Sequence, residues 1–171
     1  MMNQARNVLQ FTIWYQITEK EKIMENRYLY KAKTTPKEKG EFNNVWVIGN
    51  LIVSNGKYYI HPVGNIVNVK NEIGRIIVMH EVIPDTICQC TGLKDKNGNL
   101  IWENDIVGFW DTYSTENGQA EMDCIGKVVW DDETISFQVT NRLSAESYEV
   151  LDECSVIGNI FDNPELLESE G

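Results

Sequence analysis

Short apolar runs separated by polar turn residues recur along the chain about every ten residues, a spacing typical of all-β folds. Residues 45–53 have apolar side chains at both alternating sets of positions, which predicts a strand covered on both faces. Asn55-Gly56 follows, before the apolar residues 58–60, and two such runs joined through Asn-Gly predict a hairpin. Further apolar runs lie at residues 66–69 and 75–83. We therefore expect a meander of hairpins over residues 45–83.

The second half of the chain repeats this pattern. A tight turn is predicted at Asn97-Gly98, because both residue types tolerate positive φ angles. Residues 111–123 are mostly polar and are predicted to form a long loop. The apolar runs of this half lie at residues 100–102, 106–110, 124–130, 134–140 and 154–161. Short strands at this spacing predict an SH3-like barrel over about residues 100–161, with a final helical turn after Asn163-Pro164.

The fold class predicted for the whole chain is mainly β, with short terminal helical segments. A length of 171 residues fits one domain. We assign residues 1–23 to an N-terminal extension and residues 24–171 to the β domain, with a hairpin meander at 24–90 and an SH3-like barrel part at 91–167. The residues predicted to form the core are Trp46, Leu51, Leu93, Ile101, Trp102, Ile106, Val107, Val128, Trp130, Phe137, Ile157 and Ile160.

One stretch of the sequence is specific enough to suggest a family. Residues 91–98 read Thr-Gly-Leu-Lys-Asp-Lys-Asn-Gly, and residues 101–107 read Ile-Trp-Glu-Asn-Asp-Ile-Val. Together with the segments at 46–51, 126–132 and 156–167, these stretches resemble the YopX-like family of phage and prophage proteins. The resemblance spans about residues 28–167.

The resemblance implies a mostly β fold and a phage or prophage origin, and therefore the cytoplasm of a bacterial host. The family brings no established activity, so no catalytic, cofactor-binding or metal-binding residue is carried over. The sequence departs from the family pattern at Cys90, where an aromatic residue is expected, and at Cys88 and Asn104, where glycine is usual. The departure at Asn104 calls the local turn geometry into question, whereas the predicted fold is unaffected.

The net charge of −11 is concentrated in the second half of the chain. Residues 101–171 carry 17 Asp or Glu and only 2 Lys or Arg. Such a negative field repels phosphates, so we expect no direct binding of nucleic acid by this half. The acidic surface is interpreted either as a solvated surface or as one that attracts basic proteins. No apolar run approaches the roughly 18 residues of a membrane helix, so no membrane partner is expected.

The four cysteines have two readings. Cys88 and Cys90 share a strand face, and with Cys124 and Cys154 they could form a zinc site with four thiolate ligands. Structural zinc sites usually contain two close cysteine pairs, however, and only one such pair exists here. The apolar context of each cysteine favours core packing and reduced thiols in a cytosolic protein, since no signal peptide is expected.

The two histidines, His61 and His80, lack the neighbouring pattern of a catalytic triad and are interpreted as structural or surface residues. Carboxylates gather at two corners, with Glu103 and Asp105 at one and residues 131–133 at the other. A metal-dependent hydrolase could use such groups, but turn and capping roles are favoured. Asp105 is expected to accept backbone N–H bonds. The predicted site residues are therefore none, and no cofactor is expected.

The function favoured by the sequence is that of a non-enzymatic phage or prophage accessory protein that binds an unknown host or phage protein. Exposed strand edges would also allow a homo-oligomer. Two alternatives stay open. One is an acidic decoy of nucleic acid that occupies the groove of a host nucleic-acid-binding protein. The other is a small metal-dependent hydrolase built on the acidic turn residues.

Overall fold

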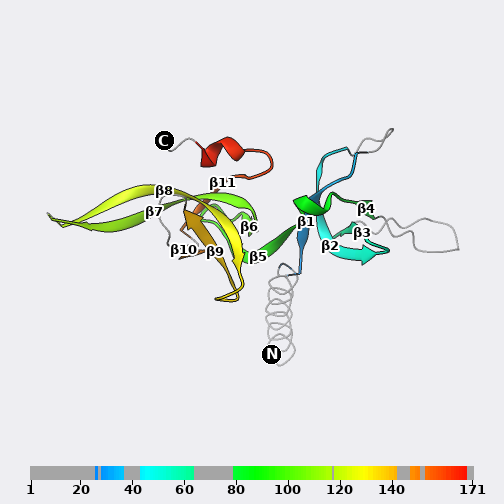
Figure 1. The fold of residues 1–171 in the computed structure, drawn as a ribbon, viewed down its shortest axis with the longest axis horizontal. Coiled ribbons are helices and arrows are strands. Elements are labelled where there is room, and N and C mark those ends of the chain that lie inside the picture. Colours follow the sequence, from blue (N-terminus) through cyan, green and yellow to red (C-terminus); the bar gives the residue numbers. More distant parts are fainter. Residues whose placement is uncertain are drawn as a thin grey trace, which may run out of the picture.

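The computed structural model describes residue 26 and residues 28–36, 43–63, 79–116, 118–141, 147–150 and 153–168, and these fold almost entirely into two antiparallel sheets (Figure 1). The prediction of a mainly β fold is confirmed. The predicted N-terminal extension, the predicted strand at 66–69 and the beginning of the one at 75–83 lie outside the described residues.

The first sheet has six strands in the order β4-β3-β2-β1-β5-β6. Its strands are β1 (Tyr30–Lys33), β2 (Trp46–Ser54), β3 (Lys57–Pro62), β4 (His80–Glu81), β5 (Cys88–Lys94) and β6 (Leu100–Trp102), with the short helix η1 (Pro84–Thr86) before β5. The predicted Asn-Gly hairpin is confirmed, because Asn55 and Gly56 connect β2 to β3 with φ angles of 52° and 74°.

The second sheet has five strands in the order β10-β9-β8-β7-β11. Its elements are β7 (Asp105–Thr115), β8 (Gly118–Asp131), β9 (Ser136–Asn141), β10 (Ser147–Glu149), β11 (Ser155–Asn159) and the helix η2 (Pro164–Leu167). The predicted long loop at 111–123 is wrong, since β7 and β8 pair from Ile106↔Lys127 to Thr115↔Gly118. Main-chain pairing within a hairpin needs no apolar run, so a polar segment can still form strands.

The SH3-like barrel is not confirmed. Both sheets stay open in the described part of the chain, with β4 and β6 at the edges of the first and β10 and β11 at the edges of the second. A barrel requires its two edge strands to pair, and here β6 pairs with β5 instead of with a strand of the second sheet. The division of the domain between residues 90 and 91 stays a prediction.

Three buried clusters form the core of the part of the chain that the structure describes. The largest is centred on Ile101, Val107 and Val128, a second contains Cys88, Cys90 and Trp102, and a third lies on one face of the first sheet. Of the predicted core residues, those that are buried or partly buried are Trp46, Leu51, Ile101, Trp102, Ile106, Val107, Val128, Phe137 and Ile160.

For three residues, the prediction that they lie in the core is wrong. Leu93, Trp130 and Ile157 are 44%, 43% and 43% exposed. Leu93 lies near the end of β5, Trp130 lies next to the β8–β9 turn, and Ile157 lies in the bulge of β11, so neighbouring strands do not cover them. Across the described ranges, the chain contains no helix with the length and apolar character needed to span a bilayer.

Candidate functional site

The carboxylate of Asp105 lies at the junction between the two sheets. It is 1% exposed, and its Oδ1 atom is 2.5 Å from Nζ of Lys31 on β1. The backbone N–H of Trp102 donates to its Oδ2 atom at 2.9 Å, which confirms the expected acceptor role at this corner. Burial raises the pKa of Asp105, and the positive charge of Lys31 opposes this rise. A carboxylate so enclosed is suited to fixing the corner and is poorly placed to meet a substrate.

A second ion pair lies beside the first. Lys33, two residues after Lys31 on the same face of β1, pairs with Asp162 just after β11. The indole N–H of Trp46 donates to the same carboxylate at 2.6 Å, and the side chain of Asn159 donates to it at 3.0 Å. Burial acts to raise the pKa of Asp162, but the hydrogen bonds from Lys33, Asn159 and Trp46 lower it to about 2.

The indole ring of Trp46 lies close to both of these lysines. The Nζ atoms of Lys31 and Lys33 are 5.2 Å and 5.4 Å from the centroid of the ring, within the range of cation–π attraction. The ring also packs edge-on against Phe161, with centroids 5.8 Å apart. The charged residues of this junction are therefore bound to one another and to aromatic side chains.

The turn after β5 depends on Asp95. Its carboxylate accepts hydrogen bonds from the backbone N–H groups of Asn97, Asn99 and Val156, at 2.9, 2.8 and 3.1 Å. Burial acts to raise its pKa, but these donated bonds hold the pKa at about 2. Gly98 adopts a φ of 85°, as predicted for the Asn-Gly turn. Asp95 thus ties the turn to the start of β11.

The four cysteines are buried thiols, as the core interpretation expected. Cys88 and Cys90 pack in one apolar cluster with Trp102, whereas Cys154 belongs to another cluster, so the zinc site with four thiolate ligands is not assembled. Burial raises the pKa of the Cys88 thiol to about 11. In the residues that the structure describes, no three His, Cys, Asp or Glu side chains gather where they could hold a metal ion.

The remaining candidates are separated from one another. Glu103 accepts a hydrogen bond from the backbone N–H of Gln89 at 3.3 Å, so it caps a strand of the first sheet. His61 lies on β3 opposite Asn50, and His80 lies on β4 opposite Ile60. The structure therefore does not bring these histidines to either acidic corner.

The departure at Asn104 is explained by the backbone. Asn104 adopts a φ of 65°, in the left-handed region that glycine tolerates best and asparagine next. Its N–H donates to the carbonyl of Val128, and its carbonyl accepts from the N–H of Ile160. The turn geometry at residue 104 is therefore maintained without glycine.

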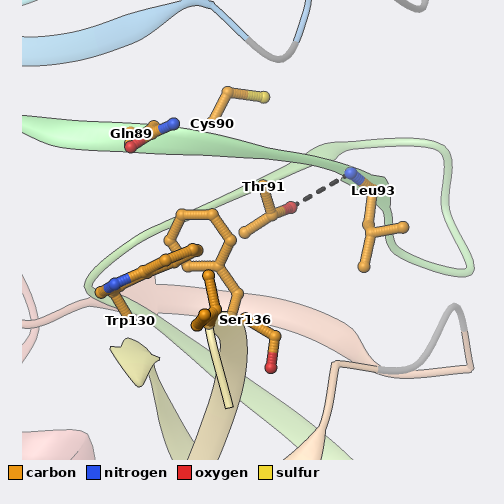
Figure 2. A pocket seen from close by; sticks show the side chains of 8 residues that line it. Gln89, Cys90, Thr91, Leu93, Trp130 and Ser136 are labelled. Atoms are coloured by element: carbon orange, nitrogen blue, oxygen red, sulfur yellow. Dashed lines mark hydrogen bonds between the residues drawn. The ribbon is translucent and has the colours of Figure 1, made fainter. Parts of the chain in front are cut away.

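The described surface has a pocket of about 380 Å³ between β5 and the β8–β9 hairpin (Figure 2). We call it the hairpin pocket. Its lining residues are Gln89, Cys90, Thr91, Leu93, Trp130, Ile135, Ser136 and Phe137. The pocket is thus lined by residues of both sheets, with β5 contributing one wall and the hairpin the other.

The walls of the hairpin pocket are held in place by local contacts. Trp130 packs edge-on against Phe137, with centroids 5.1 Å apart, and its indole N–H donates to Asp132 at 2.9 Å. On β5, the hydroxyl of Thr91 accepts from the N–H of Leu93 at 3.1 Å, as the dashed line in Figure 2 shows. The same hydroxyl donates to a carbonyl of β6 at 2.8 Å.

Sequence reasoning missed this pocket. Leu93 and Trp130 were predicted in the core, because an apolar residue in a β run gives no indication of which strands cover it. The one usable signal was the position of Trp130 and Ile135 on either side of the acidic corner 131–133, where the chain must turn at the surface. A pair of large apolar residues flanking a surface turn can indicate an exposed apolar site.

Comparison with known proteins gives one positive result. A family model described as YopX protein matches residues 24–168, which is most of the chain. None of the curated proteins searched matches the chain. The match confirms the resemblance on which the expected fold depended.

Proposed function

This chain belongs to the YopX family, and on that premise we propose that it is a non-enzymatic phage or prophage accessory protein that binds another protein in the host cytoplasm. The observation that carries the proposal is the hairpin pocket, an open hollow whose walls include the apolar side chains of Leu93, Trp130 and Phe137. Exposed apolar surface is costly in water, and where it gathers around a hollow it commonly marks an interaction site.

The way in which three carboxylates are used supports a binding role over a catalytic one. Asp95, Asp105 and Asp162 each accept two or more hydrogen bonds from the chain itself. A catalytic carboxylate needs a free face within reach of its substrate. These three groups instead position turns and join the sheets, which favours a scaffold that presents a surface.

A second candidate, the acidic decoy of nucleic acid, is favoured by one further observation. In the β7–β8 hairpin, Asp111, Glu121 and Asp123 line two strands without a basic residue between positions 109 and 126. Such a surface would attract the basic groove of a nucleic-acid-binding protein. Salt would strongly weaken this electrostatic attraction, whereas it would not weaken an apolar contact.

Affinity capture from host lysate at low and high salt tests the proposal. We compare the wild-type chain with Leu93→Ser, which removes one apolar side chain from the β5 wall of the pocket, and with Val53→Ser as a matched control on the exposed part of β2. We expect a partner that persists at high salt, is retained by the control and is captured at least about fivefold less by Leu93→Ser.

A partner captured equally by all three proteins and lost at high salt would instead support the decoy. Capture of the chain by its own copies alone, measured with two differently tagged versions, would support the homo-oligomer. Absence of any partner at both salt concentrations would contradict the proposal.

A further inference from the structure

Ile135, at the mouth of the hairpin pocket, has an unusual conformation. Its φ is 54°, in the left-handed region where the branched Cβ of isoleucine is crowded by the backbone. At the other positive-φ positions occupied by non-glycine residues in the described ranges, the chain has asparagine, namely Asn44, Asn55 and Asn104. Ile135 is therefore the one non-glycine residue with a positive φ in the described ranges that is not an asparagine.

The side chain of Ile135 is also 75% exposed, the largest exposure among the large hydrophobic residues of the described ranges. An isoleucine at this position has two free-energy costs, because it strains the backbone of the turn and because it presents apolar surface to water. Asparagine or glycine would relieve both costs. An apolar side chain at the rim of an apolar pocket has a use when a ligand covers it.

The turn that presents Ile135 is fixed by its neighbours. The carboxylate of Asp131 accepts from the N–H of Glu133 at 2.9 Å and from the hydroxyl of Thr134 at 2.8 Å. Asp132 holds the indole of Trp130, on the other arm of the hairpin, at 2.9 Å. The turn before Ile135 and the ring of Trp130 are therefore held by hydrogen bonds, which lowers the entropy lost when a ligand binds.

Three carboxylates and one lysine lie next to residues that line the pocket, in sequence or through a hydrogen bond. Asp132 and Glu133 are exposed at the hairpin tip, and Glu103 lies beside Gln89 at the β5 wall. One cation, Lys94, follows Leu93. With two exposed carboxylates at the tip, the rim favours a ligand that carries positive charge.

We propose that the hairpin pocket takes one apolar side chain from a lysine- or arginine-rich segment of a partner protein. This inference rests on the proposed function and specifies the partner. Residues 101–171 of a second copy fit less well, because they carry 17 Asp or Glu and only 2 Lys or Arg. The lysines of that copy at 31, 33 and 57 are already paired with Asp105, Asp162 and Glu81.

The test uses three fluorescein-labelled peptides and fluorescence anisotropy. The first has a leucine between two pairs of lysines, the second replaces the leucine by serine, and the third replaces the lysines by glutamates. We expect the first peptide to bind at least about tenfold more tightly than either of the others, since it satisfies both the pocket and the carboxylates next to it.

Two variants separate the two contributions. Ile135→Asn removes the apolar side chain but suits the positive φ, so it is expected to unfold at the same temperature as the wild type or higher, and to bind the first peptide at least about fivefold more weakly. Asp132→Asn combined with Glu133→Gln keeps an acceptor for Trp130 and should weaken binding mainly at low salt.

The inference is overturned if Ile135→Asn, shown to be folded by its thermal transition, binds the first peptide like the wild type. It is also overturned if the lysine and glutamate peptides bind equally. If either result accompanies a salt-resistant protein partner whose capture requires Leu93, the partner chemistry is wrong and the proposed function stands. If no salt-resistant partner that requires Leu93 is captured either, both the inference and the proposed function are contradicted.

Discussion

Asp95 shows how a single carboxylate organises two distant segments of the chain. It is only 4% exposed, and it binds backbone N–H groups of its own turn and of Val156, 61 residues further along. The bonds are donated to the ionised form, so folding favours the deprotonated carboxylate. Its folded pKa of about 2 therefore lies below the ordinary value of 3.8.

The lowered pKa predicts a pH-dependent contribution to stability. A carboxylate with a depressed folded pKa stabilises the fold above its unfolded pKa of 3.8, and this stabilisation is lost as the pH falls toward 2. We expect Asp95→Asn to lower the free energy of unfolding by about 1–3 kcal/mol at neutral pH, and by progressively less below about pH 4.

Urea unfolding from pH 7 down to pH 2 measures this difference, with Asp85→Asn as a control at an exposed position of η1. The control should track the wild type throughout. A wild-type–variant difference at Asp95 that stayed constant with pH would show that its ionised form is not what stabilises the turn.

At the scale of elements, the sequence predicted local features well and long-range ones poorly. The Asn55-Gly56 hairpin, the turn at Gly98 and the strands near 106–110 and 134–140 follow from turn chemistry and alternation, which depend on neighbouring residues. Barrel closure could not be predicted, because it depends on which edge strands meet. The exposure of Trp130 and the strain at Ile135 depend on the hairpin turn and on its uncovered position, which no local pattern contains.

The β7–β8 hairpin leads to a prediction of its own. β11 pairs with β7 only at Asp105–Gly108, and β9 pairs with β8 only at Gly126–Asp131. Beyond these contacts the two strands pair with each other alone and project as an arm from the sheet (Figure 1). A two-stranded ribbon is marginally stable in water, so we expect amides at 111–115 and 118–122 to exchange hydrogen at least about tenfold faster than those at 127–131.

Hydrogen exchange followed by mass spectrometry at peptide resolution checks this expectation. The β8–β9 segment of the same molecule is the internal reference, because β8 there pairs with β9 and contributes Val128 to the buried core. Equal protection along the whole length of β8 would mean that the arm is covered in solution, for example by a second copy of the chain.

At the scale of the whole molecule, the two sheets meet where β1 faces the second sheet. Lys31 and Lys33 reach from one face of β1 to Asp105 and Asp162, and the ring contact of Trp46 with Phe161 lies beside them. The hairpin pocket is lined by strands of both sheets. Its shape therefore depends on the junction, so these paired charges support binding indirectly, by holding the two walls of the pocket in place.

The central claim is that these conspicuous charges build the scaffold. A double-mutant cycle at Lys31 and Asp105, measured by urea unfolding, tests it most directly. Lys31→Met leaves a buried carboxylate without its cation, and Asp105→Asn leaves a buried cation while keeping an oxygen for the N–H of Trp102. Each single change is expected to lower the free energy of unfolding by about 3–5 kcal/mol.

The double variant should be more stable than the sum of the single changes predicts, by at least about 1 kcal/mol, because removing both charges leaves neither unpaired. The account would be contradicted if both single variants unfolded like the wild type while Asp105→Asn abolished partner capture. Asp105 would then act in function and not in holding the two sheets together.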